Sequence, residues 1–394
     1  MLYIIIKKSI QPIVGDLLLN ARERYIAALL FQKPDKYPFI PGGPRESTLK
    51  RWRSEGLPEN TDWFDFLRDT INIPIERTYN PKIDLPNLFG MNPAFEEKVL
   101  EHKNGHYLVQ DMHGAIVEIS DEYDVTYLRS AKDFVTRAWH KFPIETPTDW
   151  PDIKKRYNVE DPTRYPVEFA KTVKIFSQRN TPLVIAIPGP FWKLRDWVGF
   201  ENLCMLMVEN PNFVEEMAEF WKHFVLGILE RYQRYITFDS VIINEDMAYK
   251  GKSMISPAMA RRFLKPSWSA WTDLLKKSGC PVVILDSDGY IGELIPLWIE
   301  AGINACIPVE VAAGNDIVAF RKKFGKNIAY QGGIDKRAIA KGGKVIEKEL
   351  FRIIPPLFEE GGFIPSCDHG VPHDISWKSF VEYCRLLAQL TGWR

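Results

Sequence analysis

From about Ser240 onward, short runs of β-branched and apolar residues alternate with segments of helical periodicity. The apolar runs occupy residues 240–245, 281–288, 304–310, 327–333 and 362–368. Amphipathic segments separate them, at residues 258–277, 291–301, 311–324 and 344–354. Continuous apolar strands joined by helices are typical of a parallel sheet that is covered on both faces. The pattern therefore predicts an α/β fold built from repeated strand–helix units.

Similar runs occur farther upstream. Residues 182–187 form one of them, and residues 37–42 are the expected first strand, after a helix over 17–31. Six or more strand–helix units in one chain favour a (β/α)8 TIM barrel over a doubly wound sheet. No GxGxxG or Walker sequence follows any of the runs, which removes the commonest reason for the doubly wound alternative.

We expect the 394 residues to form a single domain. Residues 1–20 are predicted to be an N-terminal extension, and the barrel core is expected over about 180–394. Between them, residues 97–127 hold two alternating runs around the sequence MHG, which predict a β-hairpin insertion near the barrel mouth.

Charge and cysteine content narrow the class of protein. Fifty-one basic residues balance fifty-one acidic ones, so no global field attracts nucleic acid or an anionic membrane. No apolar run approaches the roughly 20 residues that a membrane helix needs. The five cysteines are widely spaced and contain no CxxC pair, which favours free thiols over a disulfide framework. We therefore expect a cytoplasmic protein.

Polar residues follow nearly every late strand. They are Glu245, Asp246, Asp286, Asp288, Glu310, Gln331, Asp335, Asp368 and His369. In a barrel, active sites gather where strands end, so these side chains are expected to converge on one mouth. The alternative is that they cap helices and form turns, as Asp288 before Gly289 and Asp335 before KRAIAK would. Several acids at one mouth need a cation, shared protons or a basic substrate.

The stretch FIPSCDHGVPHDIS ends the last apolar run with a polar cluster. Pro372 separates His369 from His373, so the pair does not form a helical HxxxH metal motif. We expect His369 to reach the mouth as a metal ligand or an acid/base group, with Asp368 orienting its ring. His373 is expected to be a dispensable surface residue. Upstream, Trp192 and Trp197 follow the run at 182–187, where they would form either a substrate wall or core.

Five stretches of the chain together carry a resemblance to a known family: RERYIAALLFQKPDKYPF, PLVIAIPGPFWKLRDWVGFE, VIINEDMAYKGKSMISPAMARRFLKP, AYQGGIDKRAI and GGFIPSCDHG. They resemble the uroporphyrinogen decarboxylase superfamily, which also contains methyltransferases that work with corrinoid proteins. QGGID is similar to the decarboxylases' QGNLD, and SCDHG to their LGHG, which implies that His369 matches their active-site histidine. The resemblance implies a TIM barrel.

The departures from the family pattern bear on chemistry. The decarboxylases' Arg-rich RQAGR segment corresponds to PFIPGGPRESTLKRW, in which Arg45 is the nearest cation, and Trp197 stands for their active-site tyrosine. Too few cations then face a substrate with many carboxylates. The zinc-binding HxC pair of the methyltransferases corresponds to Asp286-Ser287-Asp288, and their late cysteine to His369. The resemblance thus implies a divalent metal, such as zinc, held by Asp286, Asp288 and His369.

Two enzymatic functions follow, with a non-enzymatic binding protein as a weaker third. The favoured one is a methyltransferase-like demethylase that acts on a small molecule with a corrinoid protein as partner. The alternative is a cofactor-independent decarboxylase of a pyrrole or other ring carboxylate, in which a carboxyl group protonates the ring. A homodimer is compatible with either. The predicted catalytic residues are His369, Asp288, Glu245 and Glu310. The predicted substrate-binding residues are Trp192, Trp197, Arg45, Gln331 and Asp335.

Overall fold

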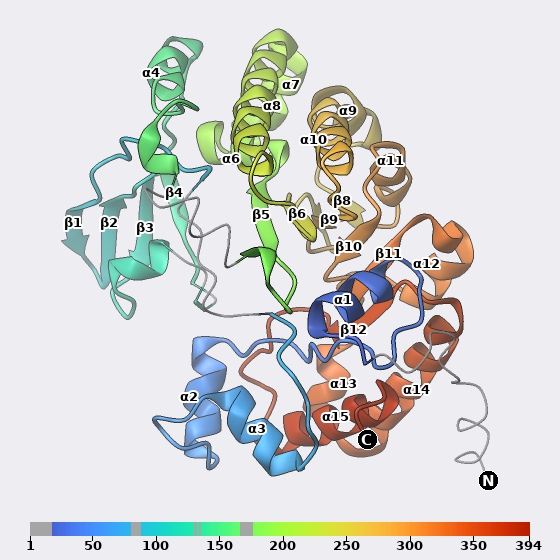
Figure 1. The fold of residues 1–394 in the computed structure, drawn as a ribbon. Helices are drawn as coiled ribbons and strands as arrows, with labels where there is room; N and C mark the ends of the chain where they lie inside the picture. The colour runs from blue at the N-terminus through green and yellow to red at the C-terminus, as the bar shows by residue number, and fades with distance from the viewer. Residues whose placement is uncertain (1–17, 80–87, 130–131, 134, 166–175) are drawn as a thin grey trace.

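The centre of the molecule is a curved parallel sheet (Figure 1). The computed structural model describes residues 18–79, 88–129, 132–133, 135–165 and 176–394. Six strands pair in chain order: β5 (Val184–Pro188), β6 (Ser240–Asn244), β9 (Val282–Asp286), β10 (Ala305–Ile307), β11 (Ala329–Ile334) and β12 (Phe363–Cys367). Strand β9 pairs in parallel with β10, with Ala305 opposite Ile284, as expected of the parallel sheet that the sequence predicts.

Helices connect successive strands and cover the outer face of the sheet. They are α6 (Pro190–Val198), α7 (Phe200–Glu209), α8 (Pro211–Gln233), α9 (Pro257–Phe263), α10 (Lys265–Lys277), α11 (Ile295–Glu300), α12 (Ile317–Phe324), α13 (Lys336–Lys341), α14 (Gly343–Glu360) and α15 (Trp377–Leu390). Alternate strand residues such as Ile243 and Leu285 point outward and are fully buried against these helices. Parallel strands joined by helices in this way are the building block of βα barrels.

The inner face of the sheet forms a second apolar cluster. Ile284 of β9 and Ile364 of β12 are fully buried there, together with Tyr25 and Leu29 of α1 (Ala21–Leu29). Helix α1 therefore closes the end of the sheet at which the strands begin. The opposite end, where the strands finish, carries the polar residues.

The segment before α2 lies beside β12 but does not form a regular strand. Val371 donates its N–H to the carbonyl of Gly43 (2.8 Å), and Pro44 makes an isolated parallel bridge with Val371. The prediction of a strand over residues 37–42 is therefore wrong. Pro38 and Pro41 lack the backbone N–H groups that hydrogen bonding in a β-sheet requires. The segment nevertheless occupies the position next to the last strand of the sheet.

A separate antiparallel sheet precedes β5 in the chain. It consists of β1 (Lys98–Lys103), β2 (His106–Gln110), β3 (Ile116–Ser120) and β4 (Ala138–Lys141), in that order. Val109, Val117 and Ile119 form its small buried core. Figure 1 shows this sheet to one side of the central one, below α4. The remaining elements are α2 (Glu46–Ser54), α3 (Trp63–Ile71), α4 (Trp150–Lys154) and the short hairpin of β7 (Ala248–Tyr249) and β8 (Lys252–Ser253).

Two expectations from composition can be compared with the structure. All five cysteines are free thiols, and four of them are buried. Within the described ranges, no helix has the length and apolar character to cross a membrane.

Candidate functional site

The carboxyl ends of the central strands present polar side chains to the interior of the sheet. Because side chains alternate along a strand, Asp286 faces the same side as Ile284, which lies in the inner apolar cluster. Asn244 is paired with Asp286 on the neighbouring strand β6 and shares this side. Ala186 on β5 is exposed although it lies in mid-strand, and Gln331 on β11 is partly exposed. The interior is thus accessible from this end, which we call the mouth.

Three carboxyl groups gather at the mouth: Asp246, Asp286 and Asp288. The backbone N–H of Asp288 donates to Oδ1 of Asp246 (3.3 Å), and that of Asp246 donates to the carbonyl of Asp286 (3.4 Å). Burial raises the pKa of Asp286 well above its ordinary value, and the negative charges of Asp246 and Asp288 raise it further. Burial and the charge of Asp288 also raise the pKa of Asp246. Such a cluster retains a proton more readily than an isolated aspartate does.

A hydrogen-bonded row crosses the mouth from Arg45 through His369 to Asp288. Nη2 of Arg45 lies 2.9 Å from Nδ1 of His369, and Nε2 of His369 lies 2.8 Å from Oδ2 of Asp288. Three distant segments supply these residues: the start of α2 and the loops after β12 and β9. The His369 side chain is 19% exposed and that of Asp288 is 40% exposed, so the row borders the accessible interior. Burial lowers the pKa of Arg45, while Asp133 and Asp288 oppose this shift.

Asp368 does not orient the ring of His369, contrary to the expectation from sequence. Its buried carboxylate accepts the backbone N–H groups of Val311 (2.8 Å) and Lys336 (3.1 Å). Neighbouring residues of an extended segment point to opposite sides, so Asp368 and His369 reach different partners. Asp368 instead joins the loop after β10 to the start of α13.

Glu310 also joins loops at the mouth. Its carboxylate accepts one hydrogen bond from Nζ of Lys336 (2.9 Å) and another from the backbone N–H of Gly289 (3.2 Å). These two bonds connect the loops after β9, β10 and β11. Asp335 is the N-cap of α13, and its carboxylate also binds the side chain of Arg337 (2.9 Å). The capping alternative considered for Asp335 therefore describes its contacts.

Gln331 and the two tryptophans differ in their access to the interior. Gln331 faces inward and accepts a hydrogen bond from the hydroxyl of Tyr79 (3.4 Å). Trp192 is partly exposed, with the guanidinium of Arg195 5.4 Å from its ring centre. Trp197 is fully buried and donates its Nε1–H to the hydroxyl of Tyr157 (3.1 Å). The structure thus places Trp197 in the core, whereas Gln331 and Trp192 are partly exposed.

The structure does not bring Glu245 to the interior of the mouth. Its carboxylate is fully buried behind β6, where it accepts the indole N–H of Trp268 (2.5 Å) and the backbone N–H of Trp192 (3.1 Å). A Cβ atom at Gly189 would collide with this carboxylate, so the start of α6 is built around it. Glu245 therefore anchors the N-terminus of α6, where helix N–H groups need acceptors.

Asp246 is the residue that sequence reasoning passed over in favour of Glu245. In SVIINED, inward-facing Ile242 predicts that Asn244 and Asp246 face inward and that Glu245 faces outward. Strand alternation was thus the signal that would have found Asp246. Its backbone has a positive φ of 42°, which is uncommon for a residue other than glycine and often occurs at functional sites.

The predicted metal ligands do not form a metal-binding group as they stand. In the ranges that the structure describes, no three His, Cys, Asp or Glu side chains lie in an arrangement that could hold a metal ion. The guanidinium of Arg45 also contacts Nδ1 of His369, which places a fixed positive charge at a potential ligand atom. Asp286, Asp288 and His369 therefore do not fit zinc in this arrangement.

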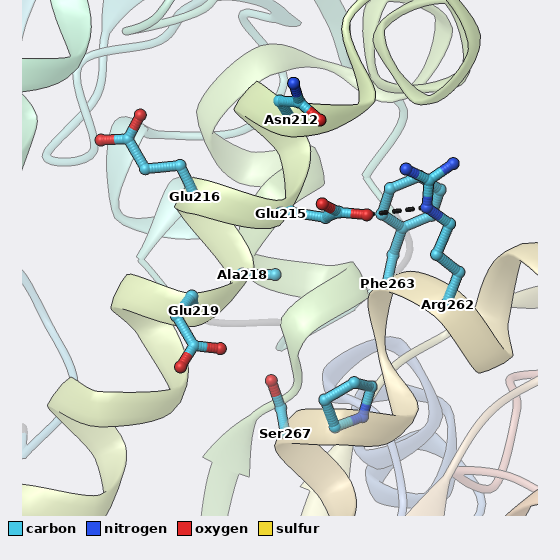
Figure 2. Close-up of a pocket in the computed structure, with 9 residues that line it drawn as sticks. Asn212, Glu215, Glu216, Ala218, Glu219, Arg262, Phe263 and Ser267 are labelled. Carbon is cyan, nitrogen blue, oxygen red and sulfur yellow. Dashed lines mark hydrogen bonds and ion pairs between the residues drawn. The ribbon is translucent and has the colours of Figure 1, made fainter.

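A surface hollow of about 430 Å³ lies outside the sheet, between α8 and the α9–α10 segment (Figure 2). Glu215 and Arg262 form an ion pair across it (2.7 Å), and Phe263 and Ser267 contribute to its wall. None of its lining residues is among those at the strand ends. We therefore place the candidate site at the mouth.

Comparisons with known proteins agree with this architecture. Among solved structures, a methyltransferase from Methanosarcina mazei is similar with a TM-score of 0.52 and 14% sequence identity, covering 94% of this chain and 98% of that chain. A proposed vitamin-B12 independent methionine synthase from Listeria monocytogenes is less similar, with a TM-score of 0.30 and 10% identity, covering 58% of this chain and 70% of that chain. No curated protein matches the sequence.

A family model described as uroporphyrinogen decarboxylase (URO-D) matches residues 138–385, which is more than half of the chain. This match and the likeness to the Methanosarcina mazei structure confirm the predicted TIM-barrel fold. The chain belongs to the uroporphyrinogen decarboxylase (URO-D) family.

Proposed function

We propose that this protein is a methyltransferase that removes a methyl group from a heteroatom of a small molecule and passes it to a corrinoid protein. The observation that carries the proposal is the inward-facing carboxyl of Asp286, whose pKa is raised by burial and by Asp246 and Asp288. A carboxyl group whose pKa is raised holds its proton to a higher pH than an ordinary aspartate does, which suits it to act as a general acid. The Methanosarcina mazei protein of the same fold is itself called a methyltransferase.

The proposed reaction needs a proton because the group that loses its methyl is a poor leaving group. The bond between the methyl carbon and the heteroatom breaks, and its electron pair stays on the heteroatom. Asp286 gives its proton to that heteroatom, while the methyl group goes to the electron pair of an acceptor. A corrinoid on the partner protein supplies this nucleophile when it is bound. The remaining carboxylate of Asp286 lies beside Asp246 and Asp288, whose charges favour its reprotonation.

A decarboxylase is the second candidate, and Arg45 is the observation that favours it. A guanidinium at the mouth suits recognition of a substrate carboxylate. In that reaction the bond to the carboxyl carbon breaks, carbon dioxide leaves, and the ring carbon takes the electron pair and then a proton from Asp286. Both candidates use the same acid, but they differ in the atom that receives the proton.

One set of assays separates the two candidates. The wild-type protein is incubated with methoxylated aromatic compounds or methylated amines and with free cob(I)alamin as acceptor, and methylcobalamin is followed by its absorbance. In parallel, pyrrole carboxylates in deuterated water are examined by mass spectrometry for loss of carbon dioxide and uptake of deuterium. Methyl transfer supports the proposal, whereas deuterated decarboxylation product without methyl transfer would replace it with the second candidate.

The role of Asp286 is tested in the assay that gives turnover. We expect Asp286→Asn to lower kcat by about 10²- to 10⁴-fold, because an amide cannot donate the proton at the required acidity. The exposed Asp273 on α10 provides the control, and Asp273→Asn should retain full turnover. Wild-type turnover in Asp286→Asn would contradict the assignment.

A further inference from the structure

In the row Arg45–His369–Asp288, the guanidinium of Arg45 is held beside the ring of His369 by several contacts. Arg45 is held at both ends: its backbone N–H donates to the carbonyl of Val371 (3.2 Å), and its Nη2 lies 2.9 Å from Nδ1 of His369. Pro44 bridges Val371 as well, so the start of α2 is joined to the loop that carries His369. The guanidinium therefore stays next to the ring through backbone as well as side-chain contacts.

Donor and acceptor chemistry then determines where the ring carries its proton. A guanidinium has five N–H donors and no acceptor, so Nδ1 of His369 has to accept the hydrogen bond through its lone pair. A neutral imidazole with a bare Nδ1 carries its hydrogen on Nε2. That N–H faces Oδ2 of Asp288 at 2.8 Å, where a carboxylate accepts it. A hydrogen on Nδ1 would point one donor at another, and a doubly protonated ring would also place a second positive charge beside the guanidinium.

We infer that Arg45 holds His369 as the neutral Nε2–H tautomer, and that His369 is a positioning residue which fixes the carboxylate of Asp288 at the mouth. His369 is then neither a metal ligand nor a proton carrier, because both ring nitrogens are engaged in this row. The tautomer follows from the contacts alone, whereas its effect on turnover rests on the proposed function.

The consequence for the site is electrostatic. A fixed Asp288 keeps its negative charge close to Asp246 and Asp286. That charge favours the protonated form of the neighbouring carboxyl groups. Arg45 thus acts on the proposed acid through two intermediaries, which is the way that supporting residues commonly tune an active site.

Nuclear magnetic resonance of the full-length protein tests the tautomer directly. The seven histidines are labelled with ¹⁵N, and His369→Gln identifies the signals of His369 in long-range ¹H–¹⁵N spectra. We expect a bare Nδ1 and a protonated Nε2 at neutral pH. An Nδ1–H tautomer or a doubly protonated ring in the wild-type protein would overturn the inference, whichever reaction the enzyme catalyses.

Variants of α2 complete the test. Arg45→Met should abolish the single tautomer of His369 and lower kcat by about 10- to 100-fold, and Arg45→Lys, which can still donate, should restore part of both. Arg51→Met is the matched control, since Arg51 lies on the same helix and donates to the carbonyl of His373 (2.8 Å) instead. An unchanged His369 spectrum in Arg45→Met would refute the role of Arg45. If Arg45→Met does not fold, the spectra of the wild-type protein and of Arg45→Lys still show whether the tautomer of His369 depends on Arg45. Failure of every methyl-transfer assay would affect the proposed function only.

Discussion

Glu245 is a fully buried carboxyl group whose surroundings change its protonation on folding. Burial raises its pKa from 4.5 to about 8, although the indole of Trp268, the N–H of Trp192 and the charge of Arg195 favour the ionised form. A group with a raised pKa binds its proton more tightly in the folded state. The stability that it contributes is therefore complete below the unfolded pKa and is lost as the pH rises through about 8.

We predict that Glu245→Gln removes this pH dependence. Glutamine can still accept the hydrogen bond from Trp268 but does not ionise, so the variant should gain relative stability of the order of a few kcal/mol above the folded pKa. Urea unfolding from about pH 5 to about pH 9 measures the effect. Glu230→Gln, at an exposed position of α8, is the control. Parallel stability profiles for the wild-type protein and Glu245→Gln would contradict the prediction.

The sequence could predict that acids gather at the strand ends but not which of them face the interior. Glu245 and Asp246 are adjacent and chemically similar, yet one anchors a helix and the other lies at the mouth. Their difference depends on the register of β6 relative to the inner apolar cluster. The sequence also could not predict that Arg45, His369 and Asp288 form one hydrogen-bonded row. Each hydrogen bond in the row joins residues more than 80 positions apart, which meet only when the chain folds.

At the scale of elements, the loop between β2 and β3 brings titratable groups close to α6. Oδ1 of Asp111 accepts the backbone N–H of His113 (2.9 Å), which fixes the loop. On α6, Lys193 is buried and donates to Asp196 (3.1 Å). Burial lowers the pKa of His113, followed by the charge of Lys193; Arg137 lowers it as well, whereas Asp196 and Asp111 oppose the shift. The lowered pKa favours the neutral form of His113 where the loop approaches α6.

We predict that acid loosens this loop. A base whose pKa is lowered on folding loses stability as the pH falls through its ordinary range, about 6.5, because the unfolded state then binds the extra proton. The protection of residues 106–120 against hydrogen exchange, corrected for the intrinsic exchange rate at each pH, should fall below about pH 6, and His113→Gln should flatten this dependence. His106→Gln is the matched control, since His106 lies exposed on β2 of the same hairpin. Equal protection factors above and below this pH in the wild-type protein would contradict the prediction.

Strands with a strong hydrophobic pattern could be predicted from the sequence. The late strands are continuous apolar runs, so their parallel pairing followed from composition and spacing. In contrast, β1 and β4 consist of exposed residues throughout and have no buried alternation to reveal them. The sequence therefore indicated a hairpin around MHG, whereas the structure adds an outer strand on each side.

At the scale of the whole molecule, contacts between residues distant in sequence join both ends of the described chain to the rest of the fold. The hydroxyl of Tyr25 on α1 lies 3.1 Å from Oγ of Ser240 at the start of β6, and Nε of Arg22 lies 2.9 Å from Asp239. At the other end of the chain, the indole of Trp393 donates to the carbonyl of Tyr37 (2.9 Å). Hydrophobic periodicity indicated the strand–helix units, but it contains no information on which helix covers the end of the sheet at which the strands begin. That choice depends on the shape of the inner apolar cluster.

We predict that Tyr25 is one of the strongest contributors to the stability of the whole barrel. Its ring is fully buried and meets Tyr79 edge to face, with ring centres 5.7 Å apart. Tyr25→Ala should lower the free energy of unfolding by about 3–5 kcal/mol, because the cavity lies where α1 meets several strands. Tyr25→Phe keeps the ring and loses only the hydrogen bond to Ser240, so it should cost about 1 kcal/mol. Urea unfolding followed by tryptophan fluorescence measures both variants. Similar losses in the two variants would show that the hydroxyl, and not the packing of the Tyr25 ring between α1 and the sheet, supplies this stability.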